Sequence, residues 1–221
     1  MEQMATSLTS LSIQGKSFLY PSPVPLKTCQ YSIQGLVTEH YVPYFRVLPW
    51  SQTVTLPLRS NQRTDDYGGS SDSRLRFALE VTTAVSERIS PSRVGFRVSP
   101  YNSFNDLQDT YEGQDQVYAT LAARLSGLGI AYLHSICPPA SANAVKLMRE
   151  NFKGTLMLNG GYDATRAEGD LSNGLADLIS FGRPFISNPN LPVKLKEGAA
   201  LVPADPNLFY TADEKGYTDY V

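Results

Sequence analysis

The amino-acid sequence predicts an α/β fold, and two observations support this prediction. From about residue 71 onward, segments with the 3.6-residue apolar period of a helix alternate with short runs of apolar and β-branched residues. Four of these runs are predicted strands, and each is followed by a predicted helix. The predicted strands cover residues 93–99, 130–136, 155–161 and 177–183. Apolar runs of this kind are typical of buried, parallel strands.

Helical periodicity is clearest in the segment that begins at residue 71. Leu75, Leu79 and Ile89 fall on one face of this segment, with polar residues opposite. Ser71 is a candidate N-cap, and Pro91 ends the helix. In all, we predict helices at about residues 71–90, 114–125, 140–151, 163–171 and 191–197.

Periodicity alone does not separate a doubly wound sheet from part of a (β/α)8 barrel. No GxGxxG motif follows the first strand, which disfavours a dinucleotide-binding doubly wound sheet. The last two strands end in Gly160-Gly161 and in Gly182-Arg183. Barrels commonly bind phosphate with the loops after strands 7 and 8. Glycine lets backbone N–H groups approach a phosphate, and Arg183 adds a bidentate donor, although tight turns also explain these glycines. The sequence therefore favours a partial (β/α)8 barrel.

Residues 1–60 differ from the rest of the chain. Prolines recur between Pro21 and Pro57, so that no long helix or central strand is expected there. Residues 39–60 hold two short β-like runs at best. We therefore divide the chain into an irregular, proline-rich segment, residues 1–60, and an α/β domain, residues 61–221.

Composition excludes several classes of function. A formal net charge of −2 and a pI near 5.7 provide no basic field for nucleic acid or an anionic membrane, so we expect a small-molecule partner. No leader peptide and no run of about 20 apolar residues is found, which predicts a cytoplasmic location. Cys29 and Cys137 show no CxxC spacing, and we expect reduced thiols and no metal site.

A series of motifs runs in order over nearly three quarters of the chain. Its members are NQRTDDYGGS (61–70), VGFRVSP (94–100), AYLH (131–134), Gly160-Gly161, ISFGRPFISNPNLPVKL (179–195) and FY with GYTDY (209–220). This series resembles the Old Yellow Enzyme family of FMN-dependent oxidoreductases and corresponds to strands 5 to 8 of that family's barrel.

The resemblance implies FMN as cofactor and NADPH as reductant, with an α,β-unsaturated carbonyl compound as substrate. It implies that Arg97 lies beneath the flavin ring, where its charge favours electron density near N1 and O2. Gly160, Gly161, Gly182 and Arg183 would then hold the FMN phosphate.

Arg97 and Tyr210 also have structural explanations, and His134 has only a structural one. A buried guanidinium needs a partner, and an ion pair of Arg97 with Asp106 or Asp109 is the alternative to a flavin. The resemblance places Tyr210 at the substrate face of the flavin, although an aromatic residue that caps the core explains it equally well. His134 is predicted to be a hydrogen-bonded structural histidine of the barrel.

The motif at Asn61, Arg63, Asp65 and Tyr67 is the most recognisable part of the match. A loop that mixes arginine, aspartate and paired glycines before a helix is typical of a hydrogen-bonded structural clamp. We therefore assign it to structure and not to catalysis.

The catalytic motif of the family is missing from this chain. Relatives carry a histidine, an asparagine or histidine three residues later, and a proton-donor tyrosine, and nothing between His40 and Asn61 reproduces this pattern. No catalytic residue is therefore assigned, and weak or absent reductase activity is expected. The alternative is a non-catalytic half barrel that serves as a structural or interaction protein and self-associates through open sheet edges. A frame or splice error over residues 39–60 would also explain the abrupt break.

Overall fold

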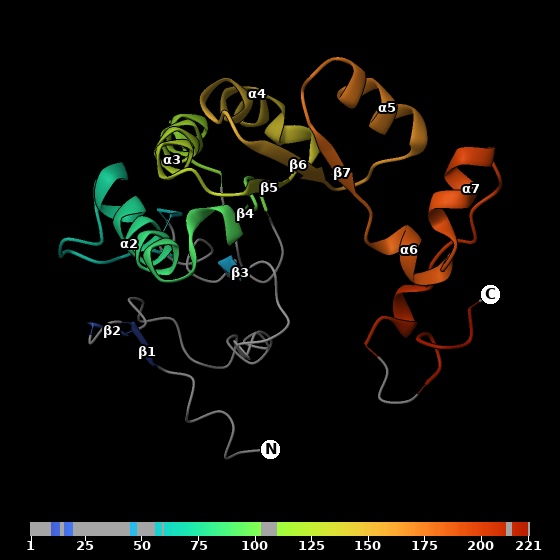
Figure 1. Cartoon of the computed structure of the whole chain (residues 1–221), viewed down its shortest axis with the longest axis horizontal. Helices are drawn as coiled ribbons and strands as arrows, with labels where there is room; N and C mark the ends of the chain where they lie inside the picture. Colours follow the sequence, from blue (N-terminus) through green and yellow to red (C-terminus); the bar gives the residue numbers. More distant parts are fainter. Residues whose placement is uncertain are drawn as a thin grey trace.

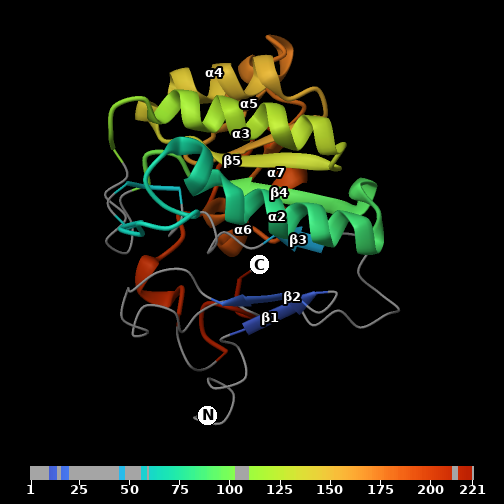
Figure 2. The same cartoon turned by 90° about the vertical axis from the view of Figure 1, so that its left-hand side faces the viewer.

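The computed structural model describes residues 10–13, 16–19, 45–47, 56–58, 60–102, 110–210 and 214–220. Its main feature is a parallel sheet of five strands in the order β3-β4-β5-β6-β7. These strands are β3 (Phe45–Val47), β4 (Val94–Val98), β5 (Tyr132–Ile136), β6 (Thr155–Asn159) and β7 (Leu178–Ser180). A separate antiparallel hairpin consists of β1 (Ser10–Ile13) and β2 (Lys16–Leu19), and it lies away from the main sheet (Figure 2).

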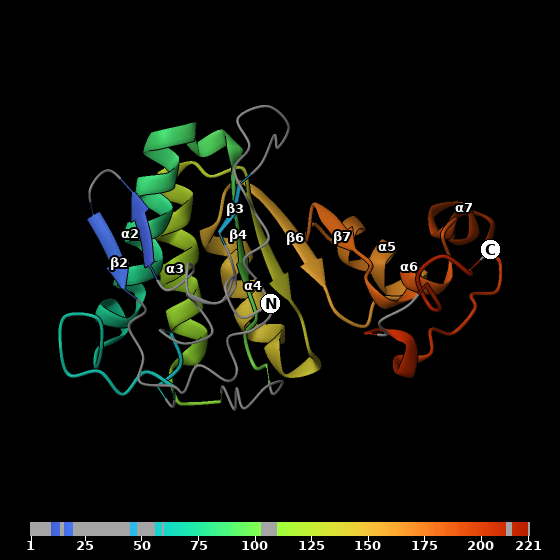
Figure 3. The ribbon, with the colours of Figure 1, turned by 90° about the horizontal axis from the view of Figure 1, so that it is seen from below.

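Helices alternate with these strands along the chain. The α-helices are α2 (Ser71–Ile89), α3 (Gln114–Leu128), α4 (Ala142–Asn151), α5 (Ala164–Ser172), α6 (Arg183–Ser187) and α7 (Leu191–Glu197). Short 3₁₀ turns are η3 (Pro91–Arg93), η4 (Pro139–Ser141) and η5 (Pro206–Leu208). In Figure 1, α2 to α5 form an arch over one face of the sheet. In Figure 3, α6 and α7 lie beyond β7 at the end of the sheet.

The hydrophobic core lies between the sheet and the helical arch. The strand residues that face the arch alternate along each strand and are fully buried: Val94, Phe96, Val98, Leu133, Leu156 and Leu158. They pack with apolar residues of the helices, among them Leu75, Leu121, Leu125 and Met148. Burial of a Leu, Val or Phe side chain contributes about 1.5–3 kcal/mol. The core is thus built on one face of the sheet only.

The other residues of the same strands form an inner face, which is less buried. Arg97, Tyr132, Met157 and Ser180 are half-buried there, and Leu178 is 47% exposed. A curved parallel sheet with helices on one face is the arrangement of a partial (β/α)8 barrel. The predicted fold is therefore confirmed, with β3 as an additional strand in the segment to which the sequence assigned no element.

The predicted strand over residues 177–183 was too long at its carboxyl end. β7 ends at Ser180, and Gly182 leaves the strand conformation with φ −104° and ψ −83°. Pro184 then lies in the first turn of α6, where its fixed φ favours a helix and its missing N–H costs no hydrogen bond. Arg183 is therefore the first residue of a helix and not the end of a strand.

No helix among the described residues is long and apolar enough to cross a membrane.

Asp177 joins three elements at the amino end of the sheet. Its Oδ2 accepts hydrogen bonds from the backbone N–H of Leu156 at 2.8 Å and from Nη1 of Arg149 at 2.7 Å. Arg149 in turn donates to the carbonyl groups of Phe152 and Gly154. The Leu156 N–H, with the Arg149 guanidinium, lowers the pKa of Asp177 below its ordinary value.

Replacing Asp177 should lower stability in a pH-dependent way. A carboxylate whose pKa is lowered by folding stabilises the protein above its unfolded pKa of about 4, and this contribution is lost as the pH falls through the folded pKa. We expect Asp177→Asn to lower the free energy of unfolding by about 1 kcal/mol at neutral pH, since solvent screens this half-exposed group. Urea unfolding at neutral and at acidic pH measures the difference.

The matched control is Asp66→Asn, which removes an exposed carboxylate that pairs with Arg76 on the surface. It should change stability little at either pH. The stabilising role of the ionised Asp177 carboxylate would be contradicted if both substitutions lowered the free energy of unfolding equally. It would also be contradicted if the effect of Asp177→Asn were the same at acidic pH.

Candidate functional site

The two glycine-bearing turns predicted to bind phosphate meet at one edge of the sheet. β6 and β7 are parallel neighbours with Asn159 opposite Ser180, so both strands end at the same edge. The side-chain Nδ2 of Asn159 donates to the carbonyl oxygen of Ser180 at 2.7 Å and ties the two strand ends together. Gly160 follows β6 directly, and Gly182 lies two residues beyond β7.

Both residues of the first turn adopt positive φ angles. Gly160 has φ +113° and Gly161 has φ +66°, a conformation that residues with a side chain rarely adopt. A Cβ atom on Gly160 would lie 3.3 Å from the backbone nitrogen of Cys137, whereas one on Gly161 would meet no atom within 4 Å. Gly160 is thus packed against β5, and Gly161 borders open space.

Three backbone N–H groups at this edge have no acceptor among the described residues. Within residues 110–210, no protein acceptor takes the N–H of Gly160, Gly161 or Gly182. Arg183 follows Gly182 directly, and its side chain is exposed. Unused N–H groups that border open space and precede an exposed arginine in the chain are suited to an oxyanion such as a phosphate.

Arg97 lies on the inner face of β4, and its partner in the structure is a histidine. Its Nη1 is 3.1 Å from Nδ1 and 3.2 Å from Nε2 of His134, which lies opposite it in β5. Asp106 and Asp109, the carboxylates considered as partners from the sequence, lie outside the described residues. Sequence analysis did not predict the contact between Arg97 and His134. The contact depends on how β4 pairs with β5, and residue spacing does not determine that pairing.

His134 continues this contact across the sheet to Ser180. Its side chain is 7% exposed, and Nε2 lies 3.0 Å from the Ser180 hydroxyl oxygen. A guanidinium only donates, so a ring nitrogen of His134 must accept from Arg97. The arrangement that satisfies all three groups has Nδ1 accepting from Arg97 and Nε2–H donating to Ser180. The predicted structural role of His134 agrees with this buried, hydrogen-bonded position.

Comparison with known proteins identifies the family. The family model described as NADH:flavin oxidoreductase / NADH oxidase matches residues 55–201. The chain belongs to this family. It is also 40% identical over 171 residues to 12-oxophytodienoate reductase 2 of Arabidopsis thaliana, covering 72% of this chain and 45% of that protein.

Solved structures give the same result for the fold. Morphinone reductase superimposes with a TM-score of 0.70 at 40% identity, over 78% of this chain and 47% of that chain. The Old Yellow Enzyme homologue of Zymomonas mobilis superimposes with a TM-score of 0.69 at 34% identity, over 76% and 49%. The chain therefore spans about half the length of the relatives it matches, and its fold is part of the Old Yellow Enzyme barrel.

Tyr210 is not part of the packed core. It follows η5, and 89% of its surface is exposed. The structure therefore excludes the core-capping alternative for this residue. Its predicted substrate role in the Old Yellow Enzyme family stays a prediction.

Cys137 follows β5 directly and is a free and buried thiol. Burial raises its pKa to about 11, so the thiol is protonated at neutral pH and is a weak nucleophile. Cys29, the other cysteine of the sequence, lies outside the described residues.

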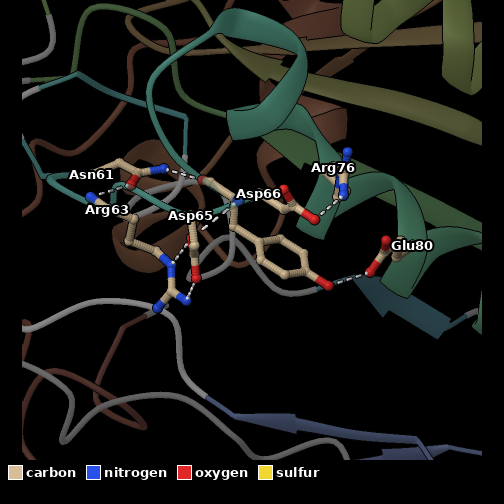
Figure 4. A network of polar contacts seen from close by, with 7 residues as sticks. Asn61, Arg63, Asp65, Asp66, Arg76 and Glu80 are labelled. Carbon is tan, nitrogen blue, oxygen red and sulfur yellow. Dashed lines mark hydrogen bonds and ion pairs between the residues drawn. The ribbon is translucent and has the colours of Figure 1, made fainter.

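The loop before α2 forms a polar network with the first turns of that helix (Figure 4). Asn61 Nδ2 donates to the carbonyl of Tyr67 at 2.8 Å, and its Oδ1 accepts from the N–H of Arg63. The remaining pairs are Arg63 with Asp65, Arg76 with Asp66, and the Tyr67 hydroxyl with Glu80 at 3.0 Å. A Cβ on Gly68 would lie 2.0 Å from the Arg63 carbonyl oxygen, so the loop requires glycine there. These contacts are those of the predicted structural clamp.

Proposed function

We propose that this chain holds FMN through its phosphate and is, by descent, an NADPH-dependent reductase of the C=C bond in α,β-unsaturated carbonyl compounds. We propose further that its activity in isolation is weak or absent. The observation that supports phosphate binding is the meeting of two glycine turns at one sheet edge, with N–H groups that no acceptor among the described residues uses.

The donor set of this edge fits the phosphate of FMN. Gly161 and Gly182 border open space, since a Cβ on either would meet no atom within 4 Å. Arg183 supplies the positive charge, and its planar guanidinium suits two phosphate oxygens at once. Gly160 keeps the turn close to the carboxyl end of β5.

Arg97 is the residue proposed to act on the flavin ring. When bound, FMN would supply the redox chemistry, taking a hydride from NADPH and giving it to the β-carbon of the substrate. Arg97 keeps a fixed positive charge on the inner face, and its contact with His134 limits the directions in which the guanidinium can point. The proposed effect is to favour electron density at the N1 and O2 end of the ring.

Weak activity is proposed because the sequence between His40 and Asn61 does not reproduce the proton donor and the substrate-binding pair of relatives. β3, the neighbour of β4 in the sheet, consists of Phe45, Arg46 and Val47 and contributes no histidine, asparagine or tyrosine. Tyr210 is the remaining candidate for contact with substrate, at a highly exposed position.

A reductase assay tests this proposal directly. Purified protein with added FMN, NADPH and cyclohexenone should turn over at least about 100-fold more slowly than the intact Arabidopsis thaliana relative, because a positioned proton donor alone contributes about that factor. Turnover equal to that of the intact relative would contradict the proposed impairment.

A second candidate function is association of a non-catalytic half barrel, and the exposure of Leu178 favours it. β7 is the last strand in the described sheet order, and its inward-facing Leu178 is 47% exposed. Phe185 and Ile186 in α6 are 44% and 38% exposed. An edge strand beside exposed apolar side chains favours pairing with another chain.

Light scattering after size exclusion tests this second candidate. The protein should elute as a dimer or larger species, and Leu178→Lys should shift it toward the monomer because a charge at the edge strand opposes pairing. Leu171→Lys on α5 is the matched control, since that leucine is 37% exposed on a helix of the outer layer. A monomeric protein at micromolar concentration would rule out self-association as the function.

A further inference from the structure

The Gly160–Gly161 turn accepts a hydrogen bond from the side chain of Arg166 in α5. Arg166 donates from Nη1 to the carbonyl oxygen of Gly160 at 3.1 Å. Nothing in the family motif GG assigns a role to this arginine. Its backbone N–H is bonded separately, at 2.8 Å, to Oδ1 of Asp163, the N-cap of α5. The root of the Arg166 side chain is thus fixed in the first turn of the helix.

The hydrogen bond to Gly160 determines where the Gly161 N–H points. Gly160 C=O and Gly161 N–H belong to one peptide unit, and the chain has no cis peptide bond among its described residues. In a planar trans peptide these two groups point in opposite directions. Because Arg166 draws the Gly160 carbonyl toward α5, the Gly161 N–H is aimed away from α5. A Cβ on Gly161 would meet no atom within 4 Å, so this residue of the turn is not packed against the protein.

Two further residues hold the Arg166 guanidinium in place. Its central carbon lies 4.1 Å from the centroid of the Tyr162 ring, a short cation–π contact. Its Nε lies 3.8 Å from Oδ2 of Asp170, and the same oxygen accepts the Tyr162 hydroxyl at 2.7 Å. Tyr162 is 6% exposed, and burial together with Asp170 raises the pKa of its hydroxyl well above the ordinary value. Tyr162 is therefore a permanent donor to Asp170, and the three side chains form a closed brace.

We propose that Arg166, braced by Tyr162 and Asp170, is a positioning residue that aims the Gly161 N–H at the phosphate of the flavin. The inference rests on the proposed FMN site and adds to it a residue that does not face the ligand. Glycine occupies both positions of the turn, and glycine adopts positive and negative φ angles about equally well. The turn could therefore adopt several backbone conformations. Packing of Gly160 against Cys137 and the bond from Arg166 select one of them.

Comparing the binding of FMN and riboflavin distinguishes a role of Arg166 in positioning the Gly161 N–H from a role in overall protein stability. FMN and riboflavin share the ring, and only FMN carries the phosphate. In fluorescence titrations, Arg166→Met should weaken FMN binding about tenfold and leave riboflavin binding unchanged, because only the phosphate loses an aligned donor. Arg166→Lys should recover part of the loss, since its ammonium group can still donate to Gly160. Arg124→Met, which removes an exposed arginine of α3, should change neither affinity.

A measurement on the ligand-free protein tests the aim of the N–H itself. The residual dipolar coupling of the Gly161 N–H reports the direction of that bond, and Arg166→Met should change it while couplings within α3 and α4 stay the same. An unchanged Gly161 coupling would overturn the inference. The inference would also be overturned if the wild-type protein preferred FMN over riboflavin and Arg166→Met did not change that preference. If the wild-type protein binds both ligands equally, the proposed phosphate site itself fails, and the coupling still decides whether Arg166 orients the turn.

Discussion

Parallel pairing of β6 with β7 is the constraint on which the candidate site depends. Parallel strands end at the same edge of a sheet, so the pairing of Asn159 with Ser180 brings the turns after both strands together. The Asn159 side chain strengthens this arrangement by donating to the Ser180 carbonyl. At the amino end of the sheet, the Asp177 side chain accepts a hydrogen bond from β6 and so connects β6 to the segment that precedes β7. The two strands are thus connected at both ends. Their pairing determines the distance between the two glycine turns.

The second organising feature is the division between the two faces of the sheet. The outer face carries the core and the helical arch, whereas the inner face carries half-buried polar residues. Arg97, His134 and Ser180 link β4, β5 and β7 across that inner face. A guanidinium on such a surface can stay partly hydrated while it keeps a fixed orientation, which suits a residue that serves a bound anion or an electron-rich ring.

The sequence predicted most of the fold because the signals involved are local. Apolar periodicity located β4 to β7 and the main helices within a few residues, and the family motifs placed them in a barrel. It did not give β3, whose three residues are too few for periodicity, nor the start of α6 at Arg183, where Gly182 and Pro184 override a strand-like run. The glycine turns and Arg97 were found from motifs, whereas His134, Ser180 and Arg166 were not assigned to the site. Their contacts depend on strand register and on the packing of α5 against a turn, and neither is encoded in residue spacing.

We propose above all that a partial barrel keeps a working phosphate site for FMN. The most direct measurement is the visible absorption spectrum of the protein purified without added cofactor. We expect flavin bands at close to one FMN per chain, which would show that this partial barrel holds the cofactor. A colourless protein that also takes up no added FMN would contradict it.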